Sequence, residues 1–360
     1  MYKVVTAAAN GTLSRAFVKE RRSTMNHLFC GVDVSKDTAV YFLIGQDRGL
    51  HDKAVVFKNN SLGYTAALKW MKGLAKQFKP FDIHVVMEAT GVYYLSLAKF
   101  FSKQTGVAVS VVNPAQVKAF AQAELIRTKT DSVDAALIAR FASAMKPGLW
   151  TPPAPHEEEM LGIVRHIEAV KEMIQAERNR LHALNEIGSS TASVQKEVRK
   201  HIKFLDGQIS DLTKRLRRLT KEYPETDENV KLLCTIPGVA ETTAHNLLCE
   251  MGDISRFGGV KQLVAFAGLA PAERQSGTSV HGKAMLNKRG SRRLRKLLYM
   301  PAVVASRFNP DVKELYDRLR AAGKKPMCAM AACMRKLLHI AYGVLKNKKP
   351  YEAYCKQVTA

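Results

Sequence analysis

The sequence predicts a protein in three parts: an α/β domain, a pair of long amphipathic helices, and a mainly α-helical C-terminal domain. Two patterns indicate this division. From His27 to Met145, short apolar segments with the alternation of β-strands are interspersed with segments of helical periodicity. Beyond a proline-rich segment at 150–155, apolar residues recur at spacings of three and four residues. A chain of 360 residues is long enough for two or three folding units.

The α/β domain is expected over residues 27–150. Its strands are predicted at 27–34, 38–45, 53–58, 82–88 and 107–113, and its helices from Ser61, near 92–104 and at 131–145. Three early strands followed by alternating helices and strands are the order of elements in an RNase H-like fold. Residues 1–26 are polar and basic and lack either periodicity, so we expect a disordered arm there.

The second part, residues 156–222, carries two apolar stripes. The first runs from Met160 to Leu184 and the second, after a break at Gly188, from Val198 to Leu219. Such stripes predict two long helices of the coiled-coil type. They can pair as an antiparallel hairpin within one chain or join two chains, and the sequence leaves both arrangements open. We interpret the helices as a structural or dimerising element rather than a catalytic one.

The third part, residues 225–348, is predicted to be a separate helical domain, followed by a tail at 349–360. Its turn at 236–239 is similar to a helix-hairpin-helix element, in which Gly238 and the next helix N-terminus offer backbone N–H groups to a phosphate. A polar, glycine-rich loop is expected between Pro271 and Ser291, and helices rich in Arg and Lys follow to about Lys346.

The charge of the chain indicates a polyanionic partner. It has 56 Lys and Arg against 32 Asp and Glu, a formal net charge of +24. Residues 281–350 alone contain 18 basic and three acidic side chains, so this region is expected to lie against phosphates. Directly after the glycine-rich loop a basic cluster is predicted to hold nucleic acid, RNA as readily as DNA: Lys288, Arg289, Arg292, Arg293, Arg295 and Lys296.

The six cysteines are scattered without the spacing of a zinc site or a disulfide framework, which suits a reducing cytoplasm. No run of about 18 apolar residues is present, so no transmembrane helix is expected. The N-terminus also lacks the apolar core of a secretory signal.

Four acidic residues are the candidate catalytic centre. Asp33 and Glu88 each stand at the C-terminal end of an apolar strand, while Asp131 and Asp134 are spaced so that they share one face of a helical turn. Clustered carboxylates repel one another unless a cation neutralises them, and oxygen ligands suit Mg²⁺ or Mn²⁺. Two such ions support phosphodiester chemistry. Taken singly, Asp131 could instead be a helix N-cap and Asp33 a turn former.

Eight motifs, in order, give the chain a family resemblance. They are GVDVSK, MEATGVYY, VVNPAQVKAFA, RTKTDSVDA, IPGV, FAGLAP, SGTSV and LRKLLYMPA. Spanning about residues 28 to 348, this string resembles the DEDD transposases of insertion sequences, a family that includes Piv-type DNA invertases and bridge-RNA-guided recombinases. The resemblance implies a RuvC-like N-terminal domain whose four metal-binding acids match Asp33, Glu88, Asp131 and Asp134. It also implies a coiled-coil linker and a C-terminal transposase domain.

The same resemblance implies a serine nucleophile at Ser276, in the segment QSGTSV, with Thr278 and Ser279 as alternative hydroxyls. It further implies an element-encoded guide RNA. We also expect action as a dimer or tetramer, because exchange of two duplexes needs several active sites. Two other functions are compatible with the residues. One is a RuvC-like nuclease that hydrolyses Holliday junctions with the carboxylates alone. The other, suggested only by charge, is a nucleic-acid-binding protein without enzymatic activity.

Overall fold

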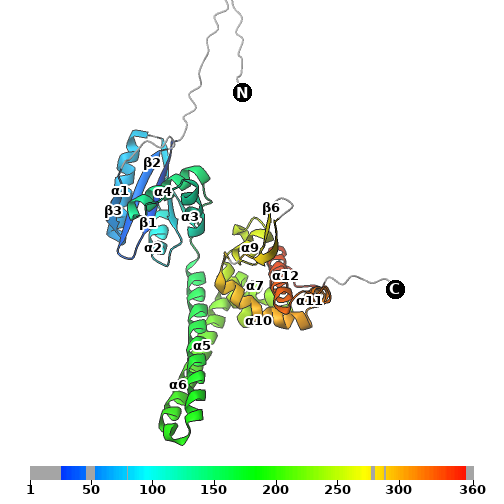
Figure 1. Ribbon diagram of the computed structural model, residues 1–360. Coiled ribbons are helices and arrows are strands. Elements are labelled where there is room, and N and C mark those ends of the chain that lie inside the picture. The colour runs from blue at the N-terminus through cyan, green and yellow to red at the C-terminus, as the bar shows by residue number, and fades with distance from the viewer. Residues whose placement is uncertain (1–25, 46–52, 79, 277–279, 288, 354–360) are drawn as a thin grey trace, which may run out of the picture. The chain divides into compact units, whose positions relative to one another are not determined.

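The computed structural model describes residues 26–45, 53–78, 80–276, 280–287 and 289–353 (Figure 1). The chain forms two compact units, an N-terminal unit (Met1–Pro152) and a C-terminal unit (Pro153–Ala360), and each is described by itself. The disordered arm predicted at the N-terminus lies outside the described residues, apart from Asn26, and so does most of the predicted tail.

The N-terminal unit is built on a mixed five-stranded sheet with the strand order β3-β2-β1-β4-β5. The strands are β1 (Asn26–Val34), β2 (Thr38–Gly45), β3 (Val55–Lys58), β4 (Phe81–Glu88) and β5 (Val107–Val112). β1 pairs antiparallel with β2, and β2 pairs antiparallel with β3. In contrast, β4 runs parallel to β1, and β5 runs parallel to β4. Antiparallel early strands followed by parallel strands confirm the predicted RNase H-like arrangement.

Helices cover both faces of this sheet. They are α1 (Ser61–Ala75), η1 (Lys76–Phe78), α2 (Tyr94–Ser102), α3 (Pro114–Ala123) and α4 (Asp131–Met145). Side chains of α1 and α2 share one apolar core with Cys30 and Val32 of β1, and α3 and α4 share a second core with Phe29 on the opposite face. Because successive strand residues point to opposite faces, alternate residues of β1 belong to the two cores.

The α3 helix was not predicted from the sequence. Asn113 is its N-cap and accepts a hydrogen bond from the Ala115 amide, while Pro114 occupies the first helical position. An N-cap residue followed by proline is a known helix start, so this signal was available. The helix was missed because only Val117 is buried and no extended apolar stripe marks it.

Gly31 of β1 allows α4 to approach the sheet closely. A Cβ at this position would overlap the carbonyl oxygen of Ala135 and the amide nitrogen of Ala139, both in the backbone of α4. A backbone cannot move aside as a flexible side chain can. The first motif of the resemblance, which contains Gly31 and Asp33, therefore also contains the residue that sets the distance between β1 and α4.

Replacing Gly31 by alanine should lower the free energy of unfolding by about 3 kcal/mol or more, because overpacking here forces backbone shifts. Chemical denaturation of the two proteins measures this loss. Gly73→Ala is the matched control, since Gly73 lies within α1 and nothing surrounds its missing Cβ within 4 Å. That substitution should leave stability unchanged or raise it by up to about 1 kcal/mol. Equal stabilities of the two variants would contradict the close-approach argument.

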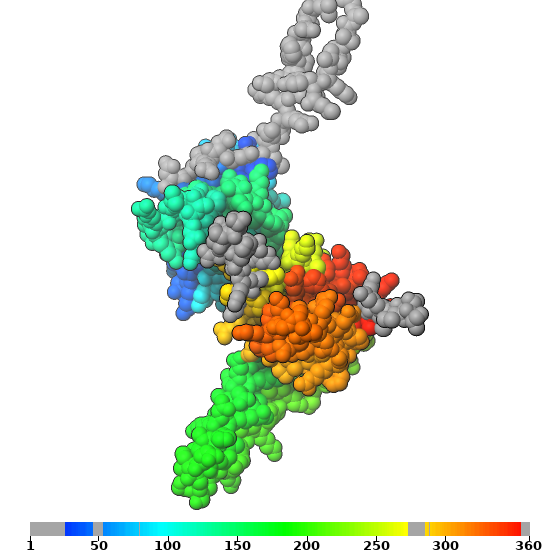
Figure 2. Space-filling view, turned by 45° about the vertical axis from the view of Figure 1, so that its right-hand side comes forward, coloured from blue at the N-terminus to red at the C-terminus, as the bar shows by residue number. Residues whose placement is uncertain are grey.

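The C-terminal unit begins with two long helices, α5 (Pro155–Ile187) and α6 (Ala192–Glu222), joined through η2 (Ser189–Thr191). They pack antiparallel within the chain: Ile167 of α5 shares a cluster with Leu216, and Ile174 shares another with Leu205. Figures 1 and 2 show this pair extending as a rod from the remaining helices of the unit. Of the two arrangements that the sequence left open, the structure has the hairpin within one chain.

The rest of the C-terminal unit is mainly helical, as predicted. Its elements are α7 (Pro224–Cys234), α8 (Glu241–Met251), η3 (Ile254–Arg256), α9 (Val260–Phe266), β6 (Pro271–Ser276), β7 (Val280–Leu286), α10 (Arg292–Phe308), α11 (Pro310–Ala321) and α12 (Pro326–Asn347). The base of the rod is tied to these elements by the ion pairs Arg165–Glu250 and Arg217–Glu241. The helical rod and the C-terminal helices thus form one compact unit.

The prediction of a glycine-rich loop between Pro271 and Ser291 was wrong. β6 and β7 form an antiparallel hairpin in this segment, with Pro271 opposite Leu286 and Ser276 opposite Val280. The strands are held together by backbone pairing, with an irregularity between Ala272 and Arg274. Such pairing needs no alternation of apolar side chains, and the sequence pattern therefore did not reveal it.

The α12 helix is the central helix of the C-terminal core. Its buried residues include Cys333, Leu337, Leu338 and Ala341, which pack among α7, α9 and α10. By length and composition it could cross a membrane, although no transmembrane helix was expected from the sequence. However, 56% of its most apolar window is buried inside the unit, as in the core helix of a globular domain.

Candidate active site

Asp33 and Glu88 come to one edge and one face of the N-terminal sheet. β1 and β4 are parallel, and their last registered pair is Val32 with Met87, so the two acids follow immediately at the same level. Val32 and Met87 both belong to the core under α1 and α2. The next residue of each strand therefore points to the other face, which α4 covers. The prediction that two strands deliver their acids to the same edge has this geometric basis.

Asp131 and Asp134 occupy the first turn of α4. Thr130 is the N-cap of this helix, and its side chain accepts a hydrogen bond from the Val133 amide. Asp131 is therefore not the N-cap, which removes the structural alternative raised for it. Nor is Asp33 a turn former, because it pairs with Val40 inside the β1–β2 ladder, and the adjacent turn is closed by Ser35 and Thr38.

The electrostatics of the site show that the acids interact. Burial raises the pKa of Asp33, and the charges of Asp131 and Asp134 raise it further. Burial likewise raises the pKa of Glu88, and the charge of Asp33 adds to this effect. In both cases the cation of Lys129 acts in the opposite direction. These carboxylates are thus held close enough to repel one another in a partly desolvated setting.

These shifts predict a pH dependence of stability. An acid whose pKa is raised by folding binds more protons in the folded chain than in the unfolded one, so the free energy of unfolding falls as pH rises. For Asp33 and Glu88 the fall begins near their ordinary values of 3.8 and 4.5 and is complete above the raised values. In a metal chelator, wild type should lose stability relative to Asp33→Asn as pH rises from about 4. A difference in stability between wild type and Asp33→Asn that stays constant across this pH range would contradict the prediction.

The predicted nucleic-acid contacts differ in their availability. Arg295 donates to the carbonyl oxygens of Ala267 and Gly290, and Lys296 pairs with Glu168 and Glu172 of α5. Both side chains therefore have contacts within the C-terminal unit.

Arg289 and Arg292 are exposed and form no ion pair with a described residue, while Arg293 lies 4.0 Å from a carboxylate oxygen of Glu250. Lys288 lies outside the described residues. Among the described members of this cluster, Arg289 and Arg292 are thus the side chains without an ion pair to another side chain or a hydrogen bond to a carbonyl oxygen.

Gly238 has a packing role in the structure. Its φ of 100° favours glycine, and a Cβ there would lie 2.9 Å from the Pro301 oxygen and the Ala305 nitrogen of α10. The helix that follows, α8, begins with Glu241, whose carboxylate forms two hydrogen bonds with Arg217. An acid already lies beside the helix N-terminus at which a phosphate was expected.

A basic hollow on α6 was not identified from the sequence. It has a volume of about 490 Å³ and is lined by Lys214, Arg217, Arg218, Lys221 and Glu222. These residues belong to a helix that was predicted from its apolar stripe, and its basic side chains were not identified as a site. The available signal was the basic run at its C-terminal end.

An RNase H-like sheet with acids at one edge, joined to a strongly basic helical region, defines an enzyme that acts on nucleic-acid phosphodiesters. Two protein-family models match the chain. A model of DEDD transposases of the IS110 type matches residues 30–187, and a model described as the transposase IS116/IS110/IS902 family matches residues 230–317. The chain belongs to this IS110 family of transposases, and it is therefore a DNA-cleaving and strand-transfer enzyme.

Full-length relatives agree with this assignment. The chain is 32% identical to the pilin gene-inverting protein of Moraxella bovis over 330 residues. This match covers 91% of this chain and 98% of that protein. The pilin gene-inverting protein of Moraxella lacunata has the same identity and coverage. The transposase for insertion sequence element IS1111A of Coxiella burnetii is 24% identical over 361 positions, covering 93% and 94% of the two chains. The family predicted from the eight motifs is confirmed.

Proposed function

We propose that this chain is a site-specific DNA recombinase of an insertion sequence, with Asp33, Glu88, Asp131 and Asp134 as its metal-binding acids and Ser276 as its nucleophile. The observation that carries the proposal is the convergence of the acids. Asp33 and Glu88 follow one registered pair on parallel strands, and the Coulomb effect of Asp131 and Asp134 reaches Asp33. Their mutual repulsion is the condition that a divalent cation relieves.

The donor set fits Mg²⁺ or Mn²⁺, the ions implied for DEDD transposases. All four proposed ligands are carboxylates, and Asp33, Glu88 and Asp134 are half-buried, so their oxygens suit a hard divalent cation. Among the described residues no three acids are yet at metal-binding spacing, so we expect their side chains to rotate on binding. A bound pair of divalent ions would stabilise charge on the attacking and leaving oxygens. The chain's own part is to position these carboxylates on a sheet edge and a helix turn.

Ser276 is the proposed nucleophile because of its place in the motif SGTSV. It is the last residue of β6, opposite Val280. In the proposed step its oxygen forms a bond to phosphorus as the bond to the leaving sugar oxygen breaks, and the hydroxyl proton passes through solvent to that leaving oxygen, which departs as a free sugar hydroxyl. The phosphoserine conserves the energy of the broken bond, so the strand can be rejoined without ATP.

Other parts of the proposal concern partners and location. Arg289 and Arg292, with Arg218 and Lys221 of the basic hollow on α6, are the favoured phosphate contacts, since these cations are exposed and form no ion pair with a described residue. Arg293, Arg295, Lys296 and Gly238 remain proposed contacts of lower availability, and Lys288, outside the described residues, remains a proposed contact. A structured guide RNA, a dimer or tetramer, and a cytoplasmic location beside the nucleoid complete the proposal.

A junction nuclease is the second candidate function. The four acids all lie in the N-terminal unit, and hydrolysis by metal-bound carboxylates needs no serine. The names of the Moraxella relatives, pilin gene-inverting proteins, support recombination instead, because inversion requires strands to be rejoined.

Trapping with denaturant tests the proposal. Wild-type protein is incubated with Mg²⁺ and a plasmid carrying the DNA of its element, then quenched in detergent. A recombinase should leave part of the protein covalently attached to DNA ends, and the attachment should disappear when a chelator replaces Mg²⁺. Cleaved DNA without attached protein, at every time of quenching, would favour the nuclease.

A further inference from the structure

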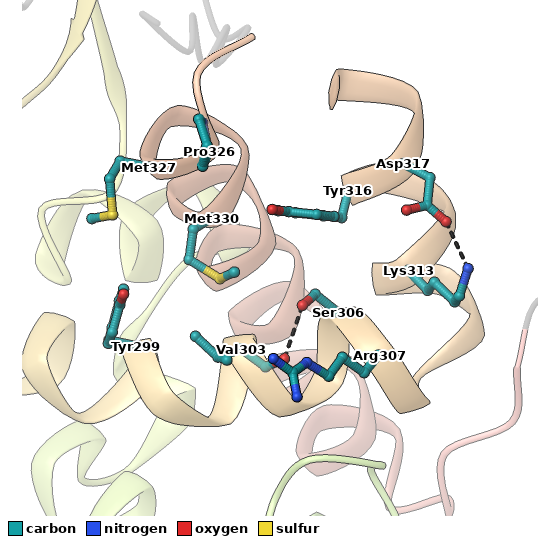
Figure 3. Close-up of a pocket in the computed structure, with 10 residues that line it drawn as sticks. All are labelled: Tyr299, Val303, Ser306, Arg307, Lys313, Tyr316, Asp317, Pro326, Met327 and Met330. Atoms are coloured by element: carbon teal, nitrogen blue, oxygen red, sulfur yellow. Dashed lines mark hydrogen bonds and ion pairs between the residues drawn. The ribbon is translucent and has the colours of Figure 1, made fainter. Parts of the chain in front are cut away.

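An open cavity of about 610 Å³ lies between α10, α11 and the start of α12, in the C-terminal unit. Its lining is mostly aromatic and apolar. Figure 3 shows Tyr316 reaching from α11 toward Met330 of α12, with Tyr299 and Val303 contributed by α10. The volume is within the range of pockets that hold small organic groups. None of the proposed catalytic residues lines it.

Two side chains on the rim of the cavity are accessible to a ligand. Tyr299 is 38% exposed and Met327 is 65% exposed, although both border the cavity. Flat aromatic rings and methionines of this kind form good surfaces for a planar, polarisable group. Since Tyr side chains also end in a hydroxyl, the planar group can have polar edges.

The charges around the cavity favour an anionic ligand. Arg307 lines it, is exposed, and forms no ion pair with a described residue. Lys313 also lines it and is 2.7 Å from Asp317, the one carboxylate among the lining residues. The exposed cations Lys324 and Lys325 lead directly to Pro326 at the cavity. A ligand with a planar apolar part and phosphates on both sides matches this arrangement.

We propose that the cavity binds an unpaired base of single-stranded DNA, with the base against Tyr299 and Tyr316 and the flanking phosphates near Arg307 and Lys313. Aromatic platforms in a basic groove are the usual means of holding single strands. Duplex DNA keeps its bases stacked inside the helix and cannot fill such a cavity. The inference rests on the proposed function, because strand exchange is the step that exposes unpaired bases.

Binding of fluorescent oligonucleotides to the full chain tests this inference. The probes are oligo(dT) of about 20 nucleotides and a duplex of the same length, measured in chelator so that no strand is cut. Tyr299→Ala should weaken single-strand binding by about tenfold and leave duplex binding unchanged, because stacking is lost only from the single strand. Tyr299→Phe keeps the ring and should bind as wild type. Phe308→Ala is the matched control, since Phe308 is 71% exposed on the same helix and does not line the cavity.

A second pair of variants guards against misfolding. Met327→Glu places a carboxylate at the cavity, and Met300→Glu places one at a residue of α10 that is 61% exposed and outside the lining. Only the first should impair single-strand binding selectively. Quenching of a 2-aminopurine base within the bound strand is a direct sign of stacking, and Met327→Glu should abolish it.

Several results would overturn the inference. If Tyr299→Ala binds single strands as tightly as wild type and still exchanges strands, the cavity is not the single-strand binding site. The proposed function would be unaffected by that result. Failure of wild type to bind any DNA would contradict both. An RNA strand of the same length as the oligo(dT) probe serves as a further probe. If it binds more tightly than oligo(dT), and Tyr299→Ala loses that binding, the cavity would be assigned to RNA. A change of sedimentation in Met327→Glu without a change in binding would assign it to a second copy of the chain.

Discussion

Asp33→Asn should reduce DNA cleavage and strand exchange by at least about 100-fold, because a metal-binding carboxylate supports several kcal/mol of transition-state stabilisation and each 1.4 kcal/mol is tenfold in rate. Glu88→Gln should have a similar effect. Asparagine and glutamine keep the shape of the acids but remove the charge that holds a divalent ion. Assay of plasmid recombination in Mg²⁺, with purified protein, measures the loss.

The fold of Asp33→Asn should survive. Burial and neighbouring charges raise the pKa of Asp33, so removing its charge relieves repulsion, and in chelator the variant should melt at the same or a higher temperature. The matched control is Asp37→Asn, an exposed aspartate four residues later, which should recombine as wild type. Full activity of Asp33→Asn would contradict the assignment of the metal-binding acids.

Ser276→Ala should abolish strand exchange and the covalent attachment of protein to DNA. Without the hydroxyl no bond to phosphorus can form at this position, and the loss should exceed about 1,000-fold, as expected for removal of a nucleophile. Binding of DNA should be unchanged, because a single uncharged side chain contributes little to phosphate affinity. The measurements are recombination of a plasmid and a denaturing gel that separates free from protein-linked DNA.

The neighbouring hydroxyls supply the controls for this prediction. Thr278→Val and Ser279→Ala should retain exchange and the covalent adduct. Loss of the adduct in one of these, with Ser276→Ala active, would move the nucleophile to that residue. Cleavage that persists in all three variants without an adduct would favour the junction nuclease.

Much of the N-terminal unit could be predicted because its elements have distinct local signatures. The ends of β1 and β4 were recognised from apolar runs terminated by an acid, and the first turn of α4 from two acids spaced three residues apart. Strand and helix periodicities are properties of neighbouring residues in the chain, so they are visible without any tertiary contact. The β6–β7 hairpin has no such signature and was expected to be a loop.

The candidate contacts with nucleic acid were less predictable. A count of basic residues does not distinguish a cation that is exposed from one that is held within the fold. Arg295 and Lys296 belong to the same basic cluster as Arg292, yet they bind carbonyl oxygens and glutamates of the chain itself. Conversely, the basic hollow on α6 arises from residues spaced along one helical face and was overlooked.

The sequence by itself identified the family, the four acids that we propose as metal ligands, and the class of each long element. Only the tertiary structure decided that Asp33 and Glu88 lie on the same face of the sheet, that α5 and α6 pair within one chain, and that Gly31 must lack a side chain. The reason is physical. Periodicity states which face of an element is apolar, but the partner of that face is set by contacts between residues far apart in the chain.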